Sequence, residues 1–187
     1  MNPLLLDFPE EFETERLLIR APRPGDGAEI QAAIVESAER LKPWMPWATP
    51  IPTVEDEEEN VRRARARFLT REDMWFLLYL KGTSTFVGGS GFPRINWSVP
   101  KFEIGYWVRT RFEGQGYVAE AVEGLTRFAF DALQAHRIEI RMDERNERSW
   151  RVAERAGYTL EGTLRNDTRD VAGHLRNTRI YSKIRMD

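Results

Sequence analysis

The sequence of 187 residues contains no cysteine and only two histidines, His136 and His174. The absence of cysteine excludes disulfides, thiolate zinc ligands and a cysteine nucleophile, and it fits a reducing cytoplasm. Because the two histidines are far apart in the sequence, we expect no histidine-based metal site. The longest apolar run covers residues 74–80, far short of the roughly 20 residues of a membrane helix. We therefore expect no membrane partner.

The beginning of the chain lacks a basic flank and a long apolar stretch, so we expect no signal peptide there. The net charge of −2 is unevenly distributed: residues 1–61 carry a net −9 and the remaining residues +7. A well-mixed solvated surface explains this distribution, and the alternative is an anionic ligand on the C-terminal part with a cationic one near the N-terminal part. Neither part is basic enough to predict a nucleic-acid partner.

No internal repeat or low-complexity linker is present, so residues 1–187 are predicted to form a single domain. Apolar periodicity and turn residues predict the element order β-α-α-β-β-β-α-β-α-β-β, a mixed sheet with helices on its faces. The predicted strands are residues 16–20, 74–81, 86–92, 102–108, 137–142, 158–164 and 174–185, and the last two helices are residues 116–133 and 149–156.

The segment that follows strand 102–108 is the most informative one for function. It contains Gly114 and Gly116 and opens the helix predicted over residues 116–133. Such a loop exposes free backbone amides at the positive end of the helix dipole, which suits phosphate. The alternative is an ordinary strand-to-helix turn without a ligand.

Two nucleotide motifs fit this segment poorly. Residues 114–119 match the spacing of the dinucleotide fingerprint, but five residues separate Val108 from Gly114, whereas that motif turns tightly off its strand. The segment also lies too near the C-terminus for a second dinucleotide-fold half to follow. A phosphate-binding P-loop fits less well still, because no Gly-Lys-Ser/Thr follows.

The run Arg111-Phe112-Glu113-Gly114-Gln115-Gly116 instead resembles the Arg/Gln-x-x-Gly-x-Gly/Ala acetyl-coenzyme A signature of the GNAT superfamily of N-acetyltransferases. Four further segments are similar to its RimJ/RimL branch, which acetylates protein N-termini, notably of ribosomal proteins: residues 14–17, 43–47, 103–107, and 146–149 with 154–158. Arg at the first signature position and Tyr158, where phenylalanine is frequent, are mild departures.

The resemblance implies a GNAT-like α/β fold. Such a fold has a mixed, mostly antiparallel sheet of six or seven strands, with helices on both faces and a splayed central strand pair formed here by strands 102–108 and 137–142. It also implies acetyl-CoA as cofactor and an amine acceptor, with a protein or peptide N-terminal α-amine favoured.

The same resemblance assigns the residues expected to contact acetyl-CoA. The pyrophosphate is expected on the backbone amides of Arg111, Phe112, Glu113, Gly114, Gln115, Gly116 and Tyr117. The pantetheine arm is expected beside Trp107, Val108 and Arg109, with Asn146 and Ser149 as further contacts. Asn146 is also a good N-cap for the following helix, and both roles are compatible.

Acetyl transfer to an amine needs a general base, because an ammonium has no lone pair. Glu103 is the candidate, since a carboxylate on a central strand is costly unless it is paired; a salt bridge to an arginine of a neighbouring strand is the alternative.

Ser149 is the candidate hydrogen-bond donor to the leaving sulfur, and the alternative is that it is simply a serine in the first turn of the helix. Trp44 and Trp47 are expected either to line the acceptor pocket or to cover the open end of the sheet. Tyr106 is expected in the core.

Two other functions remain open at this point. In the first, the acceptor is a small amine such as a polyamine, an amino acid or an aminoglycoside. In the second, the protein binds acetyl-CoA as a sensor or scaffold without turnover. An exposed edge strand is compatible with a homodimer.

Overall fold

The computed structural model describes residues 2–185, which contain one eight-stranded sheet and four α-helices. The strands are β1 (Glu11–Glu13), β2 (Leu17–Arg20), β3 (Met74–Leu80), β4 (Phe86–Asn96), β5 (Lys101–Val108), β6 (Arg137–Asp143), β7 (Thr159–Arg169) and β8 (Leu175–Ile184). The helices are α1 (Gly27–Leu41), α2 (Val54–Thr70), α3 (Tyr117–Asp131) and α4 (Glu147–Arg155).

The sheet has the order β1-β2-β3-β4-β5-β6-β8-β7, and every neighbouring pair is antiparallel except β5 and β6. The predicted fold class is confirmed, but the sheet has one strand more than the upper limit of seven. The additional strand is β1, whose three residues are too short to show an alternating pattern. Phe12 of β1 stacks on Phe128 of α3 with ring centroids 4.8 Å apart, and this contact anchors the edge strand to the core.

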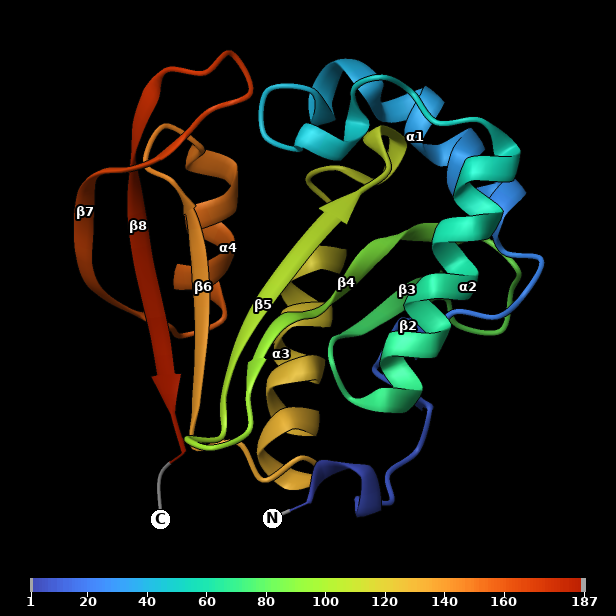
Figure 1. The fold of residues 1–187 in the computed structure, drawn as a ribbon, viewed down its shortest axis with the longest axis horizontal. Helices are drawn as coiled ribbons and strands as arrows, with labels where there is room; N and C mark the ends of the chain where they lie inside the picture. Colours follow the sequence, from blue (N-terminus) through green and yellow to red (C-terminus); the bar gives the residue numbers. More distant parts are fainter. Residues whose placement is uncertain (1, 186–187) are drawn as a thin grey trace.

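Helices cover both faces of the sheet, as the two alternating faces of β3 require. Leu77 and Tyr79 belong to a buried cluster that includes Ile34 of α1, whereas Phe76 and Leu78 belong to the larger cluster that includes Leu125 of α3. In Figure 1, α1 and α2 lie on one side of the sheet, and α3 and α4 lie behind it. The near-continuous apolar sequence of β3 follows from its burial on both faces.

The central strands β5 and β6 are splayed, as predicted. They pair only where Lys101, Phe102 and Glu103 face residues 137–139, whereas β5 remains paired with β4 as far as Val108. Figure 1 shows the two strands diverging from their paired ends. The β6-facing side of residues 104–108 therefore lacks a strand partner.

None of the helices in residues 2–185 combines the length and apolar character needed to span a membrane.

Candidate functional site

The loop between β5 and α3 presents an uninterrupted row of backbone donors. Gly114 and Gly116 have φ angles of 74° and 85°, a region that favours glycine, and Gly116 is the N-cap of α3. Within residues 2–185, the N–H groups of residues 114–119 donate to no protein acceptor, since the first bond of the helix runs from Glu120 to the Gly116 carbonyl. We name residues 114–119 the amide cradle. It is an anion site at the positive end of a helix dipole.

Glu36 of α1 holds the start of this loop through two arginines. Its Oε2 lies 2.7 Å from Arg109 Nη2 and 2.6 Å from Arg111 Nη2. The hydrogen bond from Arg111 and that from Arg109 lower the pKa of Glu36 to about 2, against the opposing effect of burial. The side chains of both arginines are thereby engaged by protein rather than directed at a ligand.

A cleft of about 970 Å³ lies beside the amide cradle, and we name it the cofactor cleft. Trp107 and Val108 on the unpaired side of β5 line it, together with most of the amide cradle and the outer face of α4. Its charged lining consists of five arginines and three glutamates, namely Arg40, Arg145, Arg148, Arg151, Arg155, Glu39, Glu113 and Glu147. The cleft is therefore suited to an elongated anionic ligand with one end on free amides.

A second cleft of about 830 Å³ reaches the same point from the other side, and we name it the acceptor cleft. Trp44 and Trp47 line it, and the Trp47 and Trp107 rings lie 5.8 Å apart in an edge-to-face arrangement. Its charged lining is balanced, with five basic and five acidic residues: Arg94, Lys101, Arg141, Arg169, Arg176, Glu103, Glu139, Asp143, Asp167 and Asp170.

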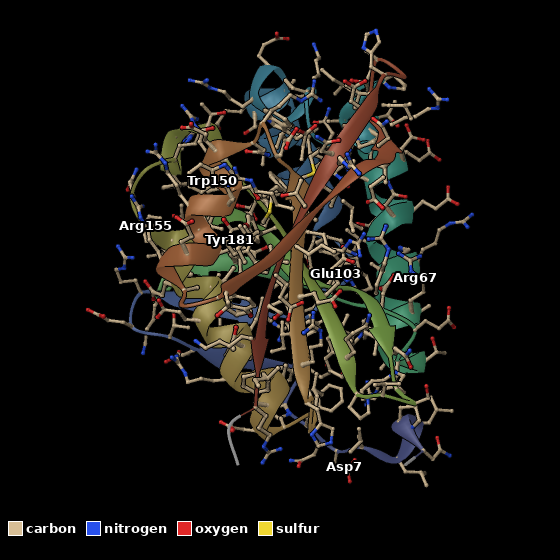
Figure 2. All side chains as sticks on the ribbon, turned by 90° about the vertical axis from the view of Figure 1, so that its left-hand side faces the viewer. Asp7, Arg67, Glu103, Trp150, Arg155 and Tyr181 are labelled. Atoms are coloured by element: carbon tan, nitrogen blue, oxygen red, sulfur yellow. The ribbon has the colours of Figure 1, made fainter. Side chains whose placement is uncertain are left out.

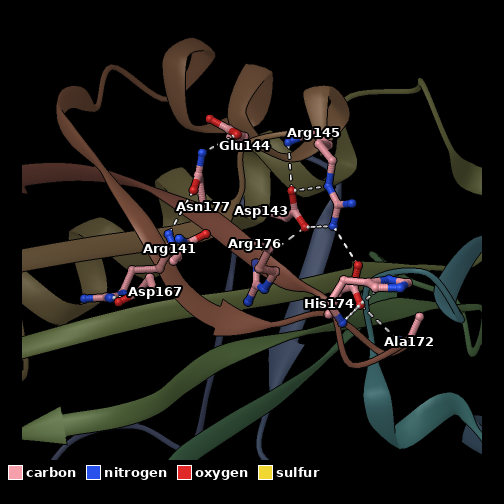
Figure 3. A network of polar contacts seen from close by, with 11 residues as sticks. Arg141, Asp143, Glu144, Arg145, Asp167, Ala172, His174, Arg176 and Asn177 are labelled. Atoms are coloured by element: carbon pink, nitrogen blue, oxygen red, sulfur yellow. Dashed lines mark hydrogen bonds and ion pairs between the residues drawn. The ribbon is translucent and has the colours of Figure 1, made fainter.

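The β7–β8 hairpin forms one wall of the acceptor cleft and is tied to the loop before α4 (Figure 3). Arg145 Nη2 lies 2.6 Å from Asp143 Oδ2 and 3.1 Å from Asp170 Oδ2 of the hairpin. Asn177 Nδ2 donates to Glu144 Oε1 at 2.6 Å. These contacts fix the hairpin relative to the loop that carries Asn146, so both walls of the site are held together.

The two clefts meet at seven shared residues: Pro43, Trp44, Met45, Tyr106, Trp107, Asn146 and Ser149. At this junction the Tyr106 hydroxyl donates to the Ser149 carbonyl at 2.9 Å and lies 3.0 Å from Ser149 Oγ. Burial raises the pKa of Tyr106 above its ordinary value, so its hydroxyl keeps its proton. Tyr106 packs against the main hydrophobic core, as expected, and its hydroxyl also reaches the junction of the two clefts. In the sequence, Tyr106 falls on the same face of strand 102–108 as Ile104, and this position gave no indication that it would lie between the two clefts. Only its contact with Ser149 of α4 shows this.

Asn146 is the N-cap of α4, and its side chain accepts a hydrogen bond from the Ser149 backbone N–H at 3.2 Å. The capping expectation is therefore confirmed. Because Asn146 also lines both clefts, its predicted contact with the cofactor is sterically open.

Glu103 lies in the acceptor cleft and pairs with Arg94 of the neighbouring strand β4, with Nη1 and Oε1 2.6 Å apart. The salt-bridge alternative is thus present in the structure. The side chain of Arg94 is 74% exposed and that of Glu103 is 14% exposed, so the arginine approaches from the solvent side. Figure 2 shows Glu103 among the central strands. Its role as a base remains a prediction.

The other predicted cofactor contacts divide into two groups. Trp107, Val108, Phe112, Glu113, Gly114, Gly116, Tyr117, Asn146 and Ser149 line the cofactor cleft. Arg109, Arg111 and Gln115 line neither cleft: the arginines bind Glu36, and Gln115 Nε2 donates to the Arg111 carbonyl at 2.8 Å. For these three residues a cofactor contact remains a prediction without a place in either cleft.

Comparison with known proteins identifies the family to which the chain belongs. The sequence model of the Acetyltransferase (GNAT) domain family matches residues 16–159. The chain belongs to the GNAT family of acetyltransferases.

Two relatives and one solved structure that resemble this chain are also named as acetyltransferases. YdaF of Bacillus subtilis (strain 168), which is named as a ribosomal N-acetyltransferase, is 30% identical over 156 residues, covering 81% of this chain and 82% of YdaF. A ribosomal-protein-serine acetyltransferase of Escherichia coli (strain K12) is 33% identical over 79 residues, 42% of this chain and 44% of that protein. The crystal structure of RimL with coenzyme A superimposes with a TM-score of 0.87 at 20% identity, covering 94% of this chain and 98% of RimL.

This GNAT protein is an acetyl-CoA-dependent N-acetyltransferase. The cofactor cleft fits that donor. It offers free amides for a diphosphate at one end, an unpaired strand edge for the amide groups of pantetheine along its length, and a surplus of arginine.

Proposed function

We propose that this GNAT enzyme transfers acetyl groups to the α-amine of a protein or peptide N-terminus, with a ribosomal protein as the acceptor. The observation that carries the proposal is the open acceptor cleft, which follows β5 from Lys101 to Trp107. These seven residues of extended strand span about 20 Å, enough for several residues of an extended peptide. A ribosomal-protein acceptor would place the reaction in the cytoplasm. The names of YdaF and of the Escherichia coli relative support the same acceptor class.

The amide cradle and the free edge of β5 orient the donor, and acetyl-CoA supplies an activated acetyl thioester. The acceptor enters from the opposite side, between Trp44, Trp47 and the β7–β8 hairpin. The two ligands can then meet only at the junction of Tyr106, Trp107 and Ser149, and we place the chemical step there.

In that step the amine nitrogen forms a bond to the acetyl carbonyl carbon, and the carbon–sulfur bond breaks. We assign Glu103 the role of base. It lies on β5 several residues from Tyr106, so it accepts the amine proton through water in the acceptor cleft. Arg94 keeps this carboxylate in place from the solvent side.

We assign Ser149 the role of hydrogen-bond donor to the departing thiolate. The Tyr106 hydroxyl lies within hydrogen-bond distance of both the Ser149 carbonyl and Ser149 Oγ, and when it donates to Ser149 Oγ the serine keeps its own proton for the sulfur. The serine hydroxyl is therefore held at the junction and can donate toward sulfur when a negative charge develops there.

The proposal is tested by measuring acetyl-CoA turnover as free thiol with pairs of peptides of the same sequence. One member of each pair begins with a free Ala, Ser or Met, and its matched control carries a blocked α-amine. We expect turnover on the free peptides and none on the blocked ones, with mass spectrometry placing the acetyl group on the N-terminal residue. A ribosomal-protein N-terminal sequence should be the best of the panel.

The same assay with polyamines, free amino acids and aminoglycosides tests the alternative acceptors. Turnover on these small amines without turnover on peptides would contradict the peptide assignment while leaving the GNAT chemistry intact. Turnover on none of them, with coenzyme A binding shown by calorimetry, would contradict it in favour of a binding protein.

A further inference from the structure

We infer that Arg151 and Arg155 of α4 bind the 3′-phosphate of coenzyme A, so that the protein distinguishes coenzyme A from its 3′-dephospho form. The inference concerns the donor alone and does not depend on which amine is the acceptor. It rests on the position of these arginines, on their lack of strong internal partners and on the charge of the two clefts.

The outer face of α4 presents a row of arginines to the cofactor cleft. Arg148, Arg151 and Arg155 follow one another at spacings of three and four residues, which places them on one face of the helix. All three line the cofactor cleft. Figure 2 shows Arg155 on the side of α4 that is turned away from Tyr181 of the sheet. The row extends about 10 Å from Arg148 to Arg155 at the helical rise per residue.

The three arginines differ in how far the protein already satisfies them. Arg148 Nη1 binds Glu113 Oε2, directly beside the amide cradle. Arg151 Nη2 lies 3.1 Å from Glu147 Oε2 in a pair whose two side chains are more than half exposed. Arg155 makes no ion pair or side-chain hydrogen bond within residues 2–185. The number of guanidinium N–H donors left without a protein partner therefore increases along α4 with distance from the amide cradle.

The chemistry of coenzyme A requires a second anion site beyond its diphosphate. The 3′-phosphate is a monoester on the ribose, and it carries about −1.5 to −2 charges at neutral pH. A planar guanidinium donates two parallel hydrogen bonds to such a group. With a diphosphate on the amide cradle, Arg151 and Arg155 are the α4 cations of the cleft that lie beyond Arg148, which Glu113 already binds. The acceptor cleft, with five basic and five acidic lining residues, has no comparable surplus.

The inference is tested by calorimetric titration of the full chain with coenzyme A and with 3′-dephospho-coenzyme A. The variants are Arg155→Gln, the double variant Arg151→Gln with Arg155→Gln, and the control Arg165→Gln. Arg165 is exposed on β7 and lines neither cleft, so the control removes the same charge elsewhere. Circular dichroism melting curves show whether each variant is folded, and the single variant suffices if the double variant unfolds.

We expect the unaltered protein to bind coenzyme A about tenfold or more tightly than the dephospho form, as one to two charge-assisted hydrogen bonds provide. The double variant should lose most of this ratio through weaker binding of coenzyme A alone, and Arg165→Gln should retain it. Equal affinities of the unaltered protein for the two ligands would overturn the inference, as would an equal loss for both ligands in the double variant. Unchanged ligand binding with a reduced kcat/KM for the acceptor would also overturn it and would assign the arginines to the acceptor.

Discussion

Arg16 and Glu120 are 104 residues apart in the sequence, yet Arg16 Nε lies 2.6 Å from Glu120 Oε2. The same carboxylate accepts hydrogen bonds from the Thr14 hydroxyl at 2.5 Å and from the Arg16 backbone N–H at 2.7 Å. The segment before β2 therefore holds the first turn of α3 from outside the cofactor cleft.

Arg16 also determines which way the loop donors point. Its Nη1 donates to the Gln115 carbonyl at 3.0 Å, and its guanidinium lies 4.5 Å from the Tyr117 ring centroid. In a trans peptide the carbonyl and the following N–H point in opposite directions. Because the Gln115 carbonyl faces Arg16, the Gly116 N–H points to the opposite side of that peptide, and Gly116 lines the cofactor cleft. Arg16 is thus a positioning residue for the donor.

Replacing Arg16 by Gln should weaken acetyl-CoA binding without slowing the chemical step. We expect the KM for acetyl-CoA and the Kd for coenzyme A to rise about fivefold to tenfold, since charge-assisted hydrogen bonds to the loop are lost. The kcat at saturating donor and the KM of the acceptor should stay unchanged. Steady-state kinetics with each substrate varied in turn, together with calorimetry, measure these quantities.

The matched control is Arg23→Gln, because Arg23 forms an exposed ion pair with Glu11 in the same N-terminal region and does not contact the loop. Its kinetic constants should equal those of the unaltered enzyme. A fall in kcat for Arg16→Gln without a change in KM for acetyl-CoA would show that Arg16 does not position the donor.

Replacing Glu103 by Gln should lower kcat about 10²- to 10⁴-fold, the usual contribution of a general base. The Kd for coenzyme A should not change, because Glu103 lies in the acceptor cleft only. Arg94→Gln is the discriminating control, since it removes the ion pair and keeps the carboxylate. If Glu103 serves only as the partner of Arg94, both variants will show the same small loss. We expect a much larger loss for Glu103→Gln.

Replacing Tyr106 by Phe should lower kcat up to about tenfold while leaving the Kd for coenzyme A nearly unchanged. The ring is retained, but Ser149 loses the hydroxyl that fixes its carbonyl and its Oγ. Ser149→Ala should produce a loss of at least that size, and the double variant should be no worse than Ser149→Ala, because the two residues act as one unit. Additive losses in this double-mutant cycle would separate Tyr106 from Ser149.

Much of the fold and the amide cradle could be predicted because the signals are local. Apolar periodicity predicted α3 to within two residues at its C-terminal end, and the loop with Gly114 and Gly116 was predicted to expose free backbone amides at the start of that helix. The predicted end of β7 at Leu164 was too early, since the strand continues to Arg169. Its mostly exposed side chains carry no alternating pattern, so its length depends on pairing with β8 rather than on its own residues.

The contacts that orient the site could not be predicted, because they join residues far apart in the chain. Nothing near Arg16 indicates Glu120, and nothing near Ser149 indicates Tyr106. Arg111 illustrates the same limit from the opposite direction. Its place in the glycine motif suggested a contact of its backbone amide with the cofactor, whereas both its N–H and its guanidinium donate to Glu36 of α1. Such pairs depend on how helices and strands pack, which a local pattern does not specify.

Glu36 should make the stability of the protein depend on pH in the acidic range. Its pKa of about 2 in the folded state is below its ordinary 4.5, because Arg111 and Arg109 bind the charged form. A lowered folded pKa stabilises the protein above about pH 4.5, and the contribution is lost as the pH falls toward about 2. Glu36→Gln should therefore lower the free energy of unfolding by about 1 to 2 kcal/mol at pH 7, after allowance for solvent screening of Arg111.

Urea unfolding at pH 7, 4.5 and 3 measures this effect, and the difference in the free energy of unfolding between Glu36→Gln and the unaltered protein should become smaller as the pH falls. Glu123→Gln is the control, because Glu123 is an exposed residue of α3 without an ion pair in residues 2–185, and it should show little change at any pH. A difference for Glu36→Gln that is constant with pH would show that the carboxylate is not held in its charged form.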